Sequence, residues 1–260
     1  MKQFVGSHDI LFITLDTLRF DAAQSAWRDG KLETLSPYLG PGGWEKRHSP
    51  ASFTYAAHQA FFAGFLPTPL EPGPHPRLFA AHFAGSTTTT ESTFTFSEAT
   101  LPEALGARGY ATICIGGTGF FNQQNALSRV LPGLFKEAHW SPELGVTCRR
   151  SAENQVEKAI ESLTKVGNER AFLFMNIAAI HQPNWFYGAS EGPDTLETHT
   201  TALVAVDKAL RPLFQTMKQR APAFVILCSD HGHAYGEDGY NGHRIGHEVV
   251  WTVPYAQFEL

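Results

Sequence analysis

Three segments of the sequence contain residue types that could act together in chemistry: ITLDTLRFD at 13–21, SFTYAAHQAFFAGFLP at 52–67 and CSDHGHAYGEDGYNGHRIGH at 228–247. The first contributes Asp16, the second Thr54, and the third the adjacent pair Asp230 and His231. Carboxylates, a hydroxyl and an imidazole together suit Zn²⁺ or Mn²⁺, whereas an oxygen-only site favours Mg²⁺ or Ca²⁺. We therefore predict a divalent metal site, with Zn²⁺ first, Mn²⁺ close behind, and Mg²⁺ or Ca²⁺ as alternatives.

Each of these residues also has a simpler interpretation. Asp and Thr are favoured N-caps of helices, so Asp16 and Thr54 could be caps alone. A single His is usually structural. A dense group of histidines beside a carboxylate is harder to explain by packing. That group is His231, His233, His243 and His247, with His181 from an earlier segment. We expect several of them to converge on one face, although the sequence assigns no role to His233 or His247.

Thr54 begins a segment whose Ala57, Ala60, Phe61 and Gly64 fit one face of a helix. A hydroxyl at a helix start lies beside free backbone N–H groups and the positive end of the helix dipole. These N–H groups can bind anionic oxygens, and a nearby metal lowers the pKa of the hydroxyl. Thr54 is therefore a candidate nucleophile as well as a candidate metal ligand.

Short apolar segments alternate with amphipathic helices along the chain. The pattern predicts strands at 9–16, 111–117, 170–181, 223–232 and 252–258, and helices at 100–110, 151–166 and 195–220. Strands that are apolar throughout are typical of a parallel sheet covered on both faces. We predict an α/β fold, a three-layer αβα sandwich with a mostly parallel central sheet, in a single domain over 1–260. Ligands bind beyond the carboxyl ends of such strands, where Asp16, His181, Asp230 and His231 lie.

These segments together resemble the alkaline phosphatase/sulfatase superfamily. ILFITLDTLRFD is similar to the opening strand of sulfatase-type members, TYAAHQAFFAGFLP to their nucleophile segment, and SDHGHAYGEDG with the following GH and VP to their closing metal segment. NIAAIHQP is similar to the strand that delivers a substrate-facing His. The resemblance implies an alkaline-phosphatase-like fold and an enzyme that cleaves anionic esters with a divalent metal.

The resemblance also implies roles for individual residues. Asp16, Asp230 and His231 match the metal ligands, and Thr54 matches the nucleophile that also contacts the metal. His181 and His243 match positions that bind the substrate anion or a second metal, so His243 is a candidate for both roles. The nucleophile of typical sulfatases is formylglycine, which is made from Cys or Ser. Formylglycine cannot form from a Thr such as Thr54. Members with Thr act on phosphorus esters, so a phosphomonoester, phosphodiester or phosphonate is favoured over a sulfate ester.

The second metal site is the least supported part of this resemblance. Two-zinc members carry an Asp four residues before the substrate-facing His, and here that position is Ile177. Three alternatives to a hydrolase stay open: a transferase that passes the phospho-group to an alcohol, a non-catalytic metal-binding member, and a doubly wound domain whose caps and histidines are only structural.

Composition narrows the classes of partner. The formal net charge of −5 indicates no basic surface for nucleic acid, and no apolar run is long enough to span a membrane. The three Cys are widely spaced and indicate no disulfide framework. Without a recognisable signal peptide, we expect a cytoplasmic protein whose partner is a small anionic ester. The sequence does not indicate an oligomeric state.

Two segments without helical or strand pattern should shape the substrate pocket. Residues 65–97, rich in Pro, Gly and Thr, predict an irregular insertion that can include a hairpin. Residues 182–194 predict a loop directly after His181. Within that loop, Trp185 and Tyr187 are our candidates for substrate contacts.

Overall fold

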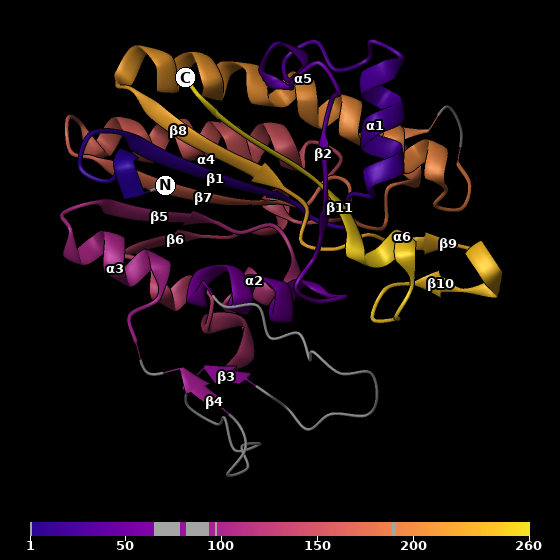
Figure 1. Cartoon of the computed structure of the whole chain (residues 1–260), viewed down its shortest axis with the longest axis horizontal. Coiled ribbons are helices and arrows are strands. Elements are labelled where there is room, and N and C mark those ends of the chain that lie inside the picture. Colours follow the sequence, from indigo (N-terminus) through magenta and orange to yellow (C-terminus); the bar gives the residue numbers. More distant parts are fainter. Residues whose placement is uncertain (1, 65–78, 82–93, 97, 189–190) are drawn as a thin grey trace.

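A seven-stranded sheet forms the centre of the computed structural model, which describes residues 2–64, 79–81, 94–96, 98–188 and 191–260 (Figure 1). The strand order is β2-β11-β8-β1-β7-β5-β6. These strands are β1 (Asp9–Leu15), β2 (Glu45–His48), β5 (Ala111–Ile115), β6 (Glu137–His139), β7 (Ala171–Ile177), β8 (Ala223–Cys228) and β11 (Thr252–Glu259). Neighbours from β8 to β6 pair in parallel, while β11 runs antiparallel to both β8 and β2.

Six α-helices accompany this sheet in the described part of the chain: α1 (Phe20–Arg28), α2 (Thr54–Ala63), α3 (Leu101–Ala107), α4 (Ser151–Val166), α5 (Leu196–Arg220) and α6 (Glu248–Trp251). Two small pairs of strands lie outside it: β3 (Phe79–Ala81) with β4 (Phe94–Phe96), and β9 (Ala234–Tyr235) with β10 (Asn241–Gly242). Short 3-10 turns, including Gly119–Phe121 and Trp185–Tyr187, connect the other elements. No described helix combines the length and apolar character that a bilayer-spanning helix needs.

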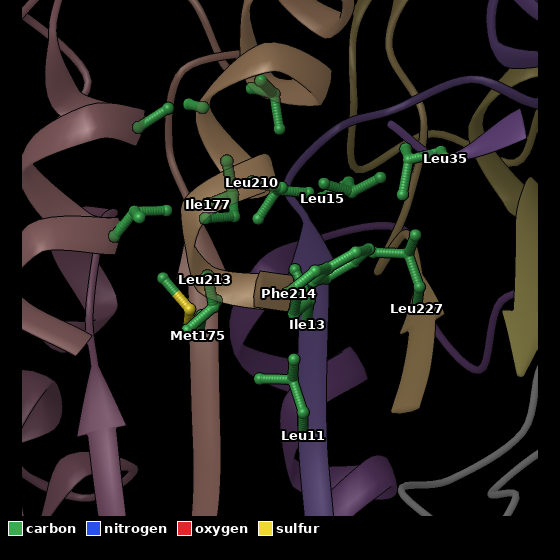
Figure 2. Close-up of a cluster of buried hydrophobic side chains, with 14 of the residues drawn as sticks. Leu11, Ile13, Leu15, Leu35, Met175, Ile177, Leu210, Leu213, Phe214 and Leu227 are labelled. Carbon is green, nitrogen blue, oxygen red and sulfur yellow. The ribbon is translucent and has the colours of Figure 1, made fainter. Parts of the chain in front are cut away.

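The helices cover the two faces of the sheet, so the predicted αβα layers are confirmed (Figure 1). Helices α1, α4 and α5 pack on one face around Leu11, Ile13 and Leu15 of β1 (Figure 2). Helices α2 and α3 pack on the other face, where the alternate residues Ile10 and Phe12 point. Because side chains alternate along a strand, each central strand contributes to both cores, which explains its continuous apolar sequence.

Several predicted elements are confirmed with small changes at their ends. Helix α4 has the predicted bounds, and Thr100 caps α3 with Glu103 in a capping box. Strand β7 stops at Ile177, so His181 lies in the turn that follows it. Both edge strands were missed, because Glu45–His48 and Glu137–His139 lack an apolar core pattern. Charged residues on an edge strand are nevertheless common, since they discourage pairing with another chain.

Most of the predicted insertion at 65–97 lies outside the described residues. Its described strands, β3 and β4, pair in parallel, so the suggestion that they form a hairpin is wrong. A hairpin requires antiparallel neighbours joined by a short turn. The single domain over 1–260 stays a prediction.

Candidate active site

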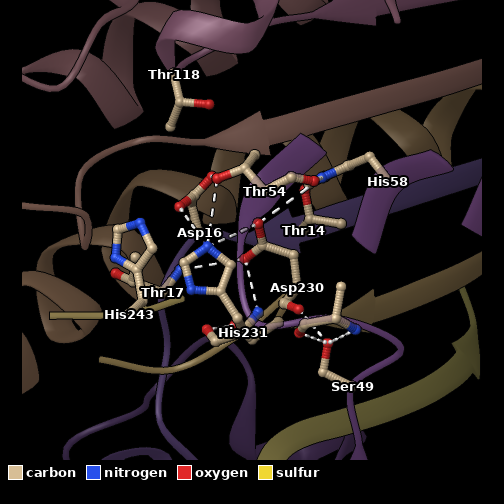
Figure 3. Close-up of polar contacts among 12 residues, drawn as sticks. Thr14, Asp16, Thr17, Ser49, Thr54, His58, Thr118, Asp230, His231 and His243 are labelled. Atoms are coloured by element: carbon tan, nitrogen blue, oxygen red, sulfur yellow. Dashed lines mark hydrogen bonds and ion pairs between the residues drawn. The ribbon is translucent and has the colours of Figure 1, made fainter. Parts of the chain in front are cut away.

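Four residues from three separate segments come together at the carboxyl end of the central strands (Figure 3). Asp16 directly follows β1, Thr54 is the first residue of α2, and Asp230 and His231 follow β8. Thr54 Oγ1 lies 3.4 Å from Asp16 Oδ2 and 3.3 Å from His231 Nε2. His231 Nε2 lies 3.8 Å from Asp16 Oδ1 and 3.5 Å from Asp230 Oδ2. The sequence motifs therefore converge on one point.

The interpretation of these residues as simple helix caps is wrong. The N-cap of α1 is Arg19, three residues after Asp16, and the N-cap of α2 is Phe53. The side chains of Asp16 and Thr54 instead point toward one another and toward His231 (Figure 3). The end of β1 and the start of α2 set the backbone positions of Asp16 and Thr54. Their side chains form a cluster with Asp230 and His231.

The cluster has the chemistry and spacing of a divalent metal site. Asp16, Asp230 and His231 offer ligand atoms that all lie within 4.8 Å of one another, and all three side chains are buried. Asp16 Oδ1 and Asp230 Oδ2 are buried without any hydrogen-bond partner. Unpaired buried carboxylate oxygens are costly, whereas a cation would stabilise them. Ligands of a tetrahedral site lie about 3.4 Å apart, close to the separations observed here.

The two buried carboxylates strongly influence each other. Burial raises the pKa of Asp16, and the charge of Asp230 raises it further. Burial also raises the pKa of Asp230 to about 7, although hydrogen bonds from the backbone N–H groups of Thr17 and His231 oppose this. Burial lowers the pKa of His231, which keeps its imidazole neutral. Without a cation the raised pKa values favour protonation of the pair as the pH falls below neutral, and metal binding would oppose it.

Backbone contacts fix the orientation of the candidate ligands. His231 Nδ1–H donates to the Gly232 carbonyl at 2.9 Å, which directs the Nε2 lone pair toward the carboxylates. Asp230 Oδ1 accepts from the N–H groups of Thr17 and His231 at 3.2 and 3.0 Å, so Oδ2 is the oxygen that faces the cluster. Thr17 has a φ of 64°, and such strain in a residue other than Gly is typical of functional sites.

Two buried polar residues that the sequence did not single out support the site. Asn176, at the end of β7, donates from Nδ2 to Asp16 Oδ2 at 2.9 Å. His58, one helical turn after Thr54, donates from Nδ1 to the Thr54 carbonyl at 2.7 Å. The Nε2 of His58 accepts from Thr14 Oγ1 at 2.9 Å, so the ring joins α2 to β1. Burial lowers the pKa of His58 to about 3, and it acts as a neutral positioning residue.

Three of the other predicted histidines, His181, His233 and His243, group beside the cluster, whereas His247 does not. His243 has its ring centroid 4.6 Å from that of His231 and 5.8 Å from that of His181. His233 lies next to His243, with their Nδ1 atoms 3.4 Å apart. His247 instead caps α6 and contacts Asp238 at 3.1 Å, so it serves the local fold. A direct role for His243 as a metal ligand stays a prediction.

A cavity of about 520 Å³ opens beside the nucleophile candidate. Thr54, His181 and His243 line it together with Arg244 and Thr118. Neither Arg244, which directly follows His243, nor Thr118 was predicted from the sequence as a site residue. Trp185 and Tyr187, our candidates for substrate contacts, are not among the residues that line this cavity. The Tyr187 ring packs against the core instead, and its hydroxyl donates to the Arg149 carbonyl.

Comparisons with known proteins identify the family and the fold of the chain. The sulfatase family model matches residues 9–255. Lipooligosaccharide phosphoethanolamine transferase A (EptA) from Neisseria meningitidis, an integral membrane protein, has a TM-score of 0.65 and 13% identity, covering 97% of this chain and 48% of that one. The periplasmic domain of EptC from Escherichia coli, in complex with Zn, has a TM-score of 0.64 and 13% identity, covering 98% and 74%.

A sulfatase, PsFucS1 from Pseudoalteromonas sp., has a TM-score of 0.57 and 15% identity, covering 99% of this chain and 63% of its own length. This chain therefore spans about half of EptA and less than two thirds of PsFucS1. A search of curated proteins found no match. The match over nearly the whole length shows that the chain belongs to the sulfatase family, and the expected alkaline-phosphatase-like fold is confirmed.

Proposed function

We propose that this sulfatase-family chain is a metal-dependent hydrolase of phosphate-type esters (phosphomonoester, phosphodiester or phosphonate) or of sulfate esters, with Thr54 as nucleophile. The observation that carries the proposal is the position of Thr54 Oγ1. It lies within 3.4 Å of Asp16 Oδ2 and His231 Nε2, beside two buried carboxylate oxygens without a partner. A hydroxyl used only to cap a helix has no need for this environment.

Asp16, Thr54, Asp230 and His231 are the residues that would hold the cation, and Zn²⁺ is the metal that best suits them, followed by Mn²⁺, with Mg²⁺ or Ca²⁺ as alternatives. Bound there, the cation supplies Lewis-acid polarisation of the ester and lowers the pKa of the nearby hydroxyl. Family membership and the E. coli EptC structure with Zn support a metal-dependent site.

The chain's own residues can complete a balanced reaction. The bond from Thr54 Oγ1 to phosphorus or sulfur forms while the bond to the leaving oxygen breaks. The hydroxyl proton of Thr54 passes to solvent, and His181, which lines the same cavity and donates from Nδ1 to the Gln182 carbonyl at 2.5 Å, is our candidate to relay a proton from solvent through Nε2 to the leaving oxygen. Burial and neighbouring imidazoles lower the pKa of His243 to about 3, so it donates a hydrogen bond as a neutral ring. Attack by water then breaks the Thr54 ester and restores the hydroxyl.

A transferase is the second candidate function. EptA is named as a phosphoethanolamine transferase, and both EptA and EptC share this fold. In that case an alcohol replaces water in the second step, and the group passes from Thr54 to the alcohol. A non-catalytic metal-binding member is the third candidate. The cytoplasmic location also remains our proposal.

Turnover by the Zn²⁺- or Mn²⁺-loaded chain should be measured on aryl phosphate, bis-aryl phosphate and aryl sulfate esters. Thr54→Ala should lower kcat/KM roughly a hundredfold or more, because it removes the nucleophile. Trapping followed by mass spectrometry should place the phospho- or sulfo-group on Thr54. Thr54→Ala with full activity would exclude this nucleophile. Product analysis with and without an added alcohol distinguishes hydrolysis from transfer, and metal binding without any turnover would favour the non-catalytic member.

A further inference from the structure

Arg244 is an exposed cation held at the edge of the candidate active-site cavity. Its backbone N–H donates to the Ser52 carbonyl at 2.8 Å, and its guanidinium lies 5.1 Å from the ring centroid of Phe53. Both partners immediately precede Thr54, so Arg244 is fixed to the segment that positions the nucleophile. Stacking on an aromatic face leaves the N–H donors at the edge of the guanidinium available.

The conformation and surroundings of Arg244 favour a ligand. Its φ of 67° lies in the left-handed region, which costs a residue other than Gly about 1 kcal/mol or more. No carboxylate in the described part of the chain pairs with its guanidinium, and no acidic residue is among the residues that line the cavity. Burial and the neighbouring imidazoles are the main causes of the lowered pKa of His243. The charge of Arg244 is a smaller cause, which indicates that the two groups are close.

The cavity is larger than the reacting ester group requires. Its volume of about 520 Å³ is in the range of pockets that enclose whole small molecules, so it can hold the leaving group as well. Asn122 and Asn125 lie on its wall, and their carboxamide oxygens accept from the backbone N–H groups of Gln124 and Ser128 at 3.0 Å. Their amide nitrogens have no hydrogen bond to a described residue, so this wall also offers donors.

We propose that Arg244 binds a second anionic group on the leaving part of the substrate, a carboxylate, sulfate or phosphate, and thereby selects esters that carry negative charge outside the reacting group. This inference rests on the proposed function for its location and deepens it by naming the substrate class. The cationic guanidinium of Arg244 and the amide donors of the wall suit anionic oxygens, while His181, His243 and Thr54 face the reacting ester. Arg244 is thus a specificity-determining residue.

The test compares phenyl phosphate with 3-carboxyphenyl phosphate, whose leaving phenols have similar acidity, and repeats the pair with the corresponding sulfates. The parent protein should prefer the carboxylated ester. Arg244→Gln should lower the ratio of the two kcat/KM values about 10- to 100-fold, the loss expected for hydrogen bonds to a charged group, and mainly through KM. Arg244→Lys should keep part of the preference, because it retains the charge. Arg211→Gln, on α5 and outside the set of residues that line the cavity, should leave the ratio as in the parent.

An equal loss on both esters in Arg244→Gln would overturn the inference, because Arg244 would then bind the reacting group. An unchanged ratio would also overturn it. Binding of phenylphosphonate and 3-carboxyphenylphosphonate, measured by calorimetry, provides a readout that does not need turnover. If the parent cleaves no ester but binds the carboxylated phosphonate more tightly through Arg244, the proposed function fails while this inference holds. Equal thermal unfolding temperatures of the Arg244 variants exclude misfolding as the cause.

Discussion

Protons and a divalent cation should compete for the carboxylates of the candidate metal site. Burial raises the pKa of Asp230 to about 7, and it raises that of Asp16 as well. A carboxylate must lose its proton to act as a ligand, so the cation has to displace protons wherever the pH is below these values. Lowering the pH from about 7.5 to about 5.5 should therefore weaken metal binding, in contrast to a site built from exposed carboxylates.

The size of the effect follows from the pKa of Asp230. With a pKa of about 7, its ionised fraction falls from about 0.76 at pH 7.5 to about 0.03 at pH 5.5. The affinity should fall roughly 25-fold from this residue alone, or about 2 kcal/mol, and Asp16 adds to the loss. A carboxylate at the ordinary pKa of 3.8 would stay almost fully ionised across this interval.

Isothermal titration of Mn²⁺ into the metal-free chain at pH 5.5, 6.5 and 7.5 measures this dependence. Repeating each titration in buffers of different ionisation enthalpy counts the protons released per cation. Asp230→Asn should bind more weakly at every pH and show a smaller pH dependence, because the titrating group is gone. An affinity that changes less than about threefold over this interval, without proton release, would refute the reasoning about the buried pair.

Two further predictions concern positions that support the site. Asn176→Ala removes the hydrogen bond to Asp16 and should weaken metal affinity about 10- to 100-fold. The same calorimetry measures this loss. An affinity equal to the parent's would show that Asn176 does not position the ligand. Gly232→Ala should destabilise the fold by about 3 kcal/mol in urea unfolding, because its Cβ would lie 1.9 Å from the Val249 carbonyl oxygen, a backbone atom. Gly133→Ala, with open space around the new methyl group, is the control, and equal losses in both variants would contradict this account.

The sequence alone determined the features that depend on local patterns. Uninterrupted apolar segments predicted the buried strands, because a strand covered on both faces has no polar side. The amphipathic pattern of 151–166 gave the bounds of α4, since its apolar face repeats with the helical period. Asp16 and the Asp230–His231 pair were recognisable because each lies within two residues or so of the end of such a strand. The carboxyl ends of parallel strands share one edge, so these residues had to meet there.

The tertiary structure decided everything that depends on partners distant in the chain. Asn176 reaches Asp16 across 160 residues, and no local pattern distinguishes it from a buried amide with another partner. In the sequence His58 is one residue of a predicted helix, and only the folded chain shows its hydrogen bond to Thr14 of β1. The candidate role of Arg244 depends on two tertiary contacts. Its backbone N–H donates to the Ser52 carbonyl, and its guanidinium stacks on the Phe53 ring. Hydrogen bonds and ion pairs between distant residues carry no periodic signature, so their assignment requires the folded chain.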